Sequence, residues 1–202
     1  FLRRLWNFAY LHHQPIAARL NNRAGDGLGA CALKKAEAEH LTEALRDVRR
    51  EIHINLRQAD FDFTRRQFNT VVSAAMKMLN TLESLGHSKA PNADAPSLAV
   101  AAEGLGILLR LLAPVVPHIT HALWVDCGYA GVGGELIQAA WPQVEEDALL
   151  RSQITLVLQI NGKVRGSIAV SADADGPTIE AAALASEAFQ RAASGQTPKK
   201  VI

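Results

Sequence analysis

The hydrophobic period of the sequence changes near residue 150, and this change restricts the fold more than any other feature. Before it, apolar residues recur every three or four positions, as in a helix with one buried face. After it, apolar and polar residues alternate, as in a strand. We therefore expect a helical bundle over residues 1–142 and a small α/β unit over residues 151–202. The clearest helical and alternating series are Leu41, Leu45, Val48, Ile52 and Leu56, and Ile154, Leu156, Leu158 and Ile160.

Within the first unit, proline, glycine and asparagine mark the expected helix boundaries. Pro15 and the Asn- and Gly-rich residues 21–29 predict a loop after the first helix. Residues 61–66 predict a break, and Asn69 is expected to cap the next helix. A Gly-rich turn is expected over residues 128–134. The expected helices are 1–13, 32–59, 69–85, 97–112 and 117–127.

The second unit is expected to begin with a β-hairpin around Asn161–Lys163. A two-residue turn would pair Ile160 with Lys163 and mix apolar and charged side chains on one face. We therefore predict a loop of odd length that aligns Leu158 with Val164, with Gly162 at positive φ. A helix over residues 177–194 and a strand beginning at residues 199–202 are expected to follow.

Composition excludes several classes of protein. The chain is 49% apolar and 20% charged, and it contains no apolar run of about 18 residues, so neither a disordered tail nor a membrane span is expected. Cys31 and Cys127 lie far apart without a CxxC pattern, which favours a reducing compartment. His118 and His121 share a helix face but lack further ligands, so no metal site is expected. No catalytic nucleophile or carboxylate pair stands out.

The net charge of +1 conceals a segmental pattern. Residues 1–70 carry 12 basic against 8 acidic residues, residues 71–150 carry 3 against 8, and residues 151–202 carry 6 against 4. The basic ends indicate a shared anionic partner, although small differences also arise by chance. From spacing alone, Lys163 and Arg165 fit either a phosphate-binding hairpin or an ordinary solvated face, and both interpretations stay open.

Several segments, in this order, resemble the C-terminal part of bacterial-type leucyl-tRNA synthetases. The resemblance covers nearly the whole chain, and the NGKVRG hairpin indicates leucine in particular. The other motifs also occur in the related class Ia enzymes for valine, isoleucine and methionine. The matching segments are FLRRLW, RRQFNTVVSAAMKMLNTL, LLAPVVPHITHALW, LVLQINGKVRGSIAV and KKVI.

This resemblance implies a mostly α chain. A helical bundle of the class Ia anticodon-binding type is followed by a small α/β C-terminal domain of β-hairpin, helix and strand, whose closing strand is expected after Ile202. It implies a fragment that holds tRNA(Leu) while a catalytic domain outside this chain, using ATP and Mg²⁺, aminoacylates it. The fragment itself is expected to lack a cofactor and to belong to a monomeric, cytoplasmic enzyme without a membrane segment.

The resemblance also suggests which residues touch tRNA. The hairpin cations match the family's NGKxRG motif and are expected at the tRNA elbow, whereas the bundle residues are weaker candidates. The full set is Lys163, Arg165, Arg3, Arg4, Asn7, Arg65, Arg66 and Lys199. Aromatic and turn residues at family positions are expected to pack: Trp6, Phe68, Pro117, His118, Trp124 and Trp141. The alternatives are a helical protein-interaction module, or the same part of a valine, isoleucine or methionine enzyme.

Overall fold

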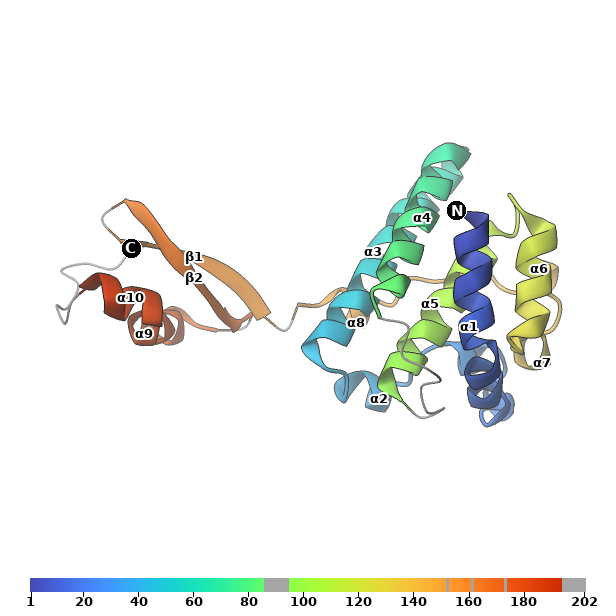
Figure 1. The fold of residues 1–202 in the computed structure, drawn as a ribbon, viewed down its shortest axis with the longest axis horizontal. Helices are drawn as coiled ribbons and strands as arrows, with labels where there is room; N and C mark the ends of the chain where they lie inside the picture. The colour runs from blue at the N-terminus through green and yellow to red at the C-terminus, as the bar shows by residue number, and fades with distance from the viewer. Residues whose placement is uncertain (86–94, 152, 161, 173, 194–202) are drawn as a thin grey trace. The chain divides into compact units, whose positions relative to one another are not determined.

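The computed structural model describes residues 1–85, 95–151, 153–160, 162–172 and 174–193 (Figure 1). The contacts divide the chain into two compact units, Phe1–Leu149 and Leu150–Ile202. The change in hydrophobic period thus lies close to a structural boundary.

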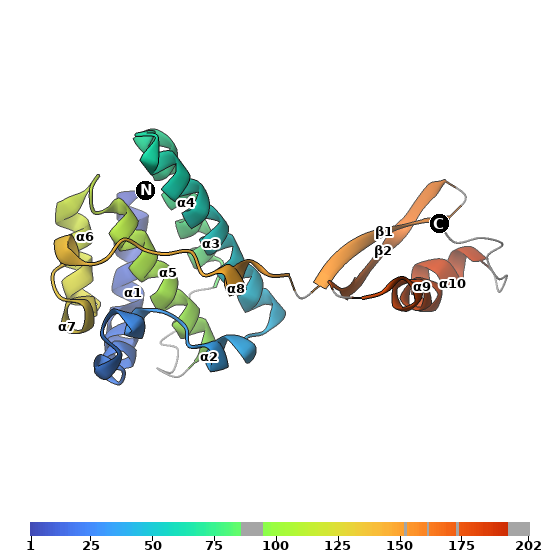
Figure 2. The ribbon, with the colours of Figure 1, turned by 180° about the vertical axis from the view of Figure 1, so that it is seen from behind.

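The first unit is a bundle of helices around one almost wholly buried helix, α5. This helix contacts α1, α3, α4 and α6 (Figures 1 and 2). All but three of its 17 residues are buried, because its sequence is apolar on every side. The elements are α1 Leu2–Asn21, η1 Ala24–Cys31, α2 Lys35–Glu39, α3 Glu43–Thr64, α4 Phe68–Glu83, α5 Pro96–Leu112, α6 Pro117–Asp126, α7 Tyr129–Gly133, η2 Leu136–Gln138 and α8 Glu146–Leu149.

The prediction of a loop after residue 13 is wrong in its first part, because α1 continues through Pro15 to Asn21. Proline within a helix removes one backbone hydrogen bond and destabilises the helix locally. Here Ile16 and Leu20 extend the buried stripe of Leu5 beyond the proline, and all three side chains are fully buried. Burial of this stripe therefore outweighs the local cost of the proline.

Other boundaries also differ from the prediction, and the single helix expected over residues 32–59 is divided between α2 and α3. α3 continues to Thr64, so the break falls at residues 65–67, and α4 begins at Phe68 with Gln67 rather than Asn69 as its N-cap. The Gly-rich residues 128–134 contain the short helix α7, with Gly128 and Gly134 flanking it at positive φ. The glycines therefore act at the two ends of a helix rather than forming one long turn.

A buried charged cluster surrounds Glu103 of α5. Arg49 of α3 contacts both carboxylate oxygens, and the backbone N–H of Leu33 donates a further hydrogen bond of 3.2 Å. His53 Nε2 lies 3.7 Å from Glu103, while His53 Nδ1 accepts a hydrogen bond from the backbone N–H of Glu145. The cluster therefore links α5, α3, residue 33 and the segment before α8.

The second unit is a two-stranded antiparallel sheet with helices against it. β1 is Gln153–Ile160 and β2 is Lys163–Ser171, and α9 Gly176–Ala185 and α10 Glu187–Ala193 follow (Figure 1). The single helix expected over residues 177–194 is instead two helices, because Ser186 adopts an extended backbone. The strand expected at residues 199–202 lies outside the described residues.

The predicted odd-length loop is wrong, and the hairpin solves the register problem in another way. Ile160 pairs with Lys163 at the turn, but the register then shifts between Leu158 and Gln159. Gln159 opposes Val164 and Leu158 opposes Gly166, so Arg165 is an additional residue in β2. The β-bulge still brings apolar residues opposite each other, but in other pairs than predicted: Leu156 faces Ile168 and Ile154 faces Val170, whereas Leu158 does not face Val164.

Among the described residues, no helix combines the length and the hydropathy that crossing a bilayer requires.

Candidate functional site

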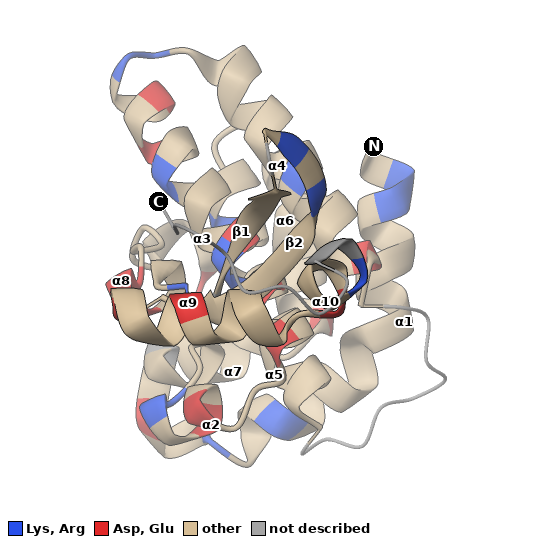
Figure 3. Ribbon diagram, turned by 90° about the vertical axis from the view of Figure 1, so that its left-hand side faces the viewer, with Lys and Arg blue, Asp and Glu red and all other residues tan. Residues whose placement is uncertain are grey.

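The end of the β-hairpin carries two exposed cations. Lys163 begins β2, and Arg165 occupies the β-bulge two residues later. Within the described part of the chain, neither side chain has a carboxylate partner. Figure 3 shows the basic segment of β2 close to the turn. A bulge re-aims side chains at the end of a ladder, and both cations are exposed there.

Two glycines shape this hairpin. Gly162 has φ +73°, the left-handed conformation that a tight turn requires and that residues with a Cβ disfavour. Gly166 follows the bulge, and a Cβ atom added there would lie 2.8 Å from Cβ of Ala188 in α10. Gly166 thus lets α10 approach the strand that carries Arg165.

The first turns of α1 contain the next predicted residues. Arg3 and Asn7 are exposed. Arg4 instead makes an ion pair with Glu83 of α4 and donates a 2.6 Å hydrogen bond to Asn80 Oδ1. Arg4 therefore connects α1 to α4, and its charge is balanced by Glu83, whereas Arg3 makes no ion pair within the described residues.

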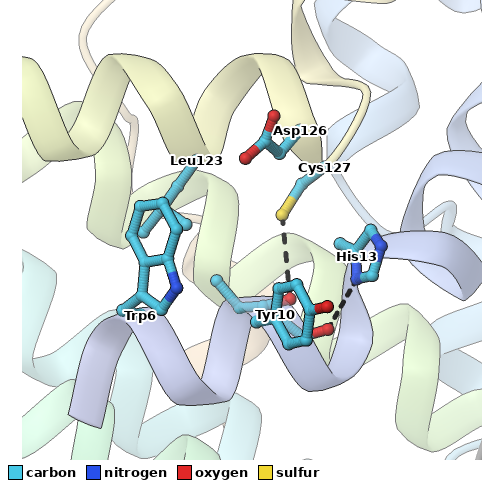
Figure 4. A pocket seen from close by; sticks show the side chains of 7 residues that line it. Trp6, Tyr10, His13, Leu123, Asp126 and Cys127 are labelled. Carbon is cyan, nitrogen blue, oxygen red and sulfur yellow. Dashed lines mark hydrogen bonds between the residues drawn. The ribbon is translucent and has the colours of Figure 1, made fainter. Parts of the chain in front are cut away.

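A surface pocket of about 180 Å³ lies between α1 and α6 (Figure 4). Arg3 and Asn7 belong to the first of these two helices. Burial raises the pKa of the Cys127 thiol to about 12, so this cysteine is protonated at neutral pH. The rings of Tyr10 and His13 stack with their centroids 5.0 Å apart. The lining residues are Trp6, Ala9, Tyr10, His13, Leu123, Asp126 and Cys127.

The turn between α3 and α4 carries Arg65 and Arg66 at the end of the paired helices (Figures 1 and 2). The backbone N–H of Gln67 donates to the carbonyl of Asp62, and that of Arg66 donates to the carbonyl of Phe63, both at 2.9 Å. This pattern is a Schellman motif, in which the residue at the Arg66 position is usually glycine because its φ is positive. Arg66 has φ +60°, the one such non-glycine residue among those described.

Two exposed aromatic residues, Phe61 and Phe68, flank these two arginines in sequence. The Arg65 guanidinium carbon lies 5.1 Å from the centroid of the Phe61 ring, which is 54% exposed. Phe68 is 46% exposed, although its family position suggested a packing residue. Its ring meets Phe63 edge to face at 5.5 Å. We call Phe61, Arg65, Arg66 and Phe68 the α3–α4 corner.

The sequence-predicted residues thus fall at three separate places: the hairpin end, the start of α1 and the α3–α4 corner. The pairing of Arg4 and the exposure of Phe61 and Phe68 are not evident from sequence periodicity. The contact between Phe61 and Arg65 could be predicted from their spacing, since residues four apart share a helix face. Lys199 lies outside the described residues. In the described ranges, no three His, Cys, Asp or Glu side chains are grouped so that they could hold a metal ion.

Comparison with known proteins finds a matching family and similar relatives. Residues 46–182 match the model of the family described as the anticodon-binding domain of tRNA ligase. The chain is 54% identical over 202 residues to the leucine–tRNA ligase of Ralstonia pickettii (strain 12J) and 52% identical over 203 residues to that of Azoarcus sp. (strain BH72). Each match covers 100% of this chain and 21% of the relative, so the chain spans about a fifth of the length of these curated relatives.

A solved structure shows the same fold. It is the crystal structure of the ternary complex of Agrobacterium radiobacter K84 AgnB2 LeuRS, tRNA and LeuAMS, with a TM-score of 0.66 and 22% identity. The match covers 98% of this chain and 23% of the other. The expected fold, a mostly α bundle followed by a small α/β unit, is confirmed. The family match, which extends over more than half of the residues, establishes that this chain belongs to the anticodon-binding domain family of tRNA ligases.

Proposed function

We propose that this chain is the tRNA-holding C-terminal portion of a leucine–tRNA ligase. It binds tRNA(Leu) and positions it for ATP-dependent aminoacylation by a catalytic domain outside the chain. The observation that carries this proposal is the match to the family, combined with the pair of exposed cations on the bulged hairpin. The similarity to ligases named for leucine favours leucine over valine, isoleucine or methionine.

Among the described residues, the proposed tRNA contacts are Arg3, Asn7, Arg65, Arg66, Lys163 and Arg165. Arginine and lysine bind phosphates without selecting a sequence, so these contacts hold the tRNA body in position. Arg4 is a weaker candidate than Arg3 because its guanidinium already pairs with Glu83. Lys199 stays a proposed contact from the resemblance alone.

The proposal extends to the setting of the protein. We propose that the chain needs no cofactor of its own, because ATP and Mg²⁺ serve the catalytic domain. We also propose that it functions within a cytoplasmic, monomeric enzyme. Size-exclusion chromatography with light scattering tests the monomer, since a concentration-dependent increase in mass would contradict it.

Binding of labelled tRNA(Leu) to the 202-residue chain at several salt concentrations tests the central proposal. We expect the logarithm of the affinity to fall linearly with the logarithm of the salt concentration, because each bound phosphate releases counterions. Unlabelled tRNA(Leu) should compete for the site. A salt-independent affinity, or no competition, would show that this chain does not bind tRNA through these cations.

A further inference from the structure

The pocket between α1 and α6 places aromatic rings opposite a carboxylate. Trp6 and Tyr10 of α1 face Asp126 and Cys127, at the end of α6, across the pocket (Figure 4). Trp6 is 39% exposed and Tyr10 is 66% exposed, so parts of both rings are uncovered. The pocket measures about 180 Å³, and a cavity of about 150 Å³ holds one benzene molecule. It therefore has room for one small organic group.

The α6 side of the pocket carries negative charge without a counter-ion. Asp126 is the last residue of α6, where the helix dipole is already negative. The last turn of this helix contains no basic residue. In the described part of the chain, Asp126 also forms no ion pair. A cation in the pocket would relieve the unfavourable meeting of carboxylate and helix end.

The α1 side of the pocket favours a cation for a different reason. The faces of tryptophan and tyrosine rings are negative and attract ammonium and guanidinium groups. The Tyr10 ring is held in place by its stack on His13, whose Nδ1 donates a 2.5 Å hydrogen bond to the Tyr10 carbonyl. Ala9 and Leu123, both buried, add an apolar lining that an alkyl chain would cover. The pocket thus matches a group with an alkyl part and a positive end.

The basic residues at the start of α1 do not supply this positive charge. Arg4 pairs with Glu83 of α4, and Arg3 does not line the pocket. The Cys127 thiol stays neutral, because burial and then the charge of Asp126 raise its pKa. The charge of the Asp126 carboxylate is therefore left for a ligand.

We propose that this pocket binds a primary alkylammonium group, the chemistry shared by a free polyamine and a lysine side chain. The ammonium pairs with Asp126 and lies against the rings of Trp6 and Tyr10, while the alkyl chain covers Leu123. The proposal goes beyond the proposed tRNA function and does not depend on it. A neutral or anionic ligand of the same size would gain the apolar contact without the charge.

The test is a titration of the ¹⁵N-labelled 202-residue chain with n-butylammonium at constant ionic strength, followed by NMR. Trp6→Phe assigns the indole N–H signal of Trp6, which should shift saturably. The Trp141 indole, which donates to Asp60 and does not line the pocket, is the internal reference and should not shift. n-Butanol and butyrate, of the same length, should bind more weakly than n-butylammonium. Equal binding of the three probes, or no saturable shift of Trp6, would overturn the proposal.

Variants of the two sides of the pocket test the assigned contacts. Asp126→Asn and Tyr10→Leu should each weaken n-butylammonium binding about 2- to 5-fold, and the double variant roughly 4- to 25-fold. Both side chains are exposed, so the variants should fold, which circular dichroism verifies. Glu180→Gln is the matched control, because it removes an exposed carboxylate of the second unit, and it should leave the affinity unchanged. Unchanged affinity in the double variant would contradict the proposal.

Two further probes distinguish the sources of the ammonium group. Tighter binding of spermidine would support a free polyamine as the ligand, whereas tighter binding of Nα-acetyl-lysine methylamide would support a lysine of a protein partner. Failure of both probes to shift the Trp6 signal would overturn the proposal. Because tRNA is absent from these titrations, none of these results bears on the proposed tRNA function.

Discussion

The Arg49 guanidinium and the Glu103 carboxylate form a two-point ion pair inside the bundle, with Nε 2.7 Å from Oε2 and Nη2 2.9 Å from Oε1. Both side chains are buried. Removal of one member of a buried pair leaves an uncompensated charge, whereas the intact pair is worth much less than this penalty suggests. The pair therefore fixes how α3 packs on α5 more than it adds net stability.

Substitution of Glu103 by glutamine should show how strongly the fold depends on the intact ion pair. We expect the free energy of unfolding to fall by about 3–5 kcal/mol, because Arg49 then stays buried without a counter-charge. Urea denaturation followed by circular dichroism measures it. The control is Arg191→Ala, which removes an exposed pair with Glu187 and should change stability by less than about 0.5 kcal/mol. A comparable loss in both variants would contradict the argument.

The free energy of unfolding should also depend on pH through the Glu103 carboxyl group. Burial alone would raise the pKa of Glu103, but His53 and Arg49 outweigh it and lower the pKa to about 2, below the ordinary 4.5. The unfolded state therefore binds a proton at a higher pH than the folded state does. The contribution of Glu103 is present above about pH 4.5 and is lost as the pH falls toward 2. Denaturation midpoints measured between pH 6 and pH 3 should decline less steeply in Glu103→Gln.

Position 66 should separate stability from RNA binding. Arg66→Gly should stabilise the fold by about 1 kcal/mol, because glycine adopts the left-handed conformation without a Cβ penalty. It should also reduce the salt slope of tRNA binding by about 1, since one phosphate contact is lost. Arg66→Gln, which keeps the Cβ but removes the charge, should weaken binding without the gain in thermal stability. Equal tRNA affinity in all three proteins would remove Arg66 from the interface.

The hairpin cations should account for a measurable share of the salt dependence. Replacement of both Lys163 and Arg165 by alanine should lower the magnitude of the slope by about 2, one for each phosphate contact. Arg191→Ala serves as the control, because it removes a cation from the same unit that is already paired with Glu187. An unchanged slope in the double variant would exclude the hairpin from phosphate binding.

The packing of α10 against β2 should require a residue without a side chain at Gly166. Gly166→Ala should destabilise the second unit by about 1–3 kcal/mol, because the new methyl group would meet Ala188 at 2.8 Å. Ala188→Gly in the same chain should restore much of the loss. Thermal unfolding of the two single variants and the double variant forms a cycle. Additive losses in the double variant would show that the two positions do not act through this contact.

Periodicity predicted the features that depend on burial along a single element. The helix over residues 97–112 was predicted to within one residue, because an apolar sequence bounded by prolines leaves little choice. The two strands of the hairpin were predicted from the alternation of apolar and polar residues. The prediction failed where tertiary contacts decide: the stripe through Ile16 and Leu20 carries α1 past Pro15.

Local pattern also could not predict the β-bulge at Arg165. The sequence required apolar residues to face each other, and both an odd loop and a two-residue turn with a bulge satisfy that requirement. The partner of Glu103 was equally hidden, since Arg49 lies 54 residues away. At the α3–α4 corner, the arginines were predicted, but the exposure of Phe61 and Phe68 depends on where the two helices end.

The segment from Trp141 to Glu146 runs antiparallel to α3 and contacts it at two places. Trp141 contacts Asp60 and Phe63, and the backbone of Glu145 contacts His53, about seven to ten helix positions earlier. Four extended residues and that stretch of helix both measure about 10–15 Å, so the two spacings match. An insertion or deletion of one residue here would slide one anchor by roughly two helix positions. Alignments of close relatives should accordingly be free of gaps between these two positions.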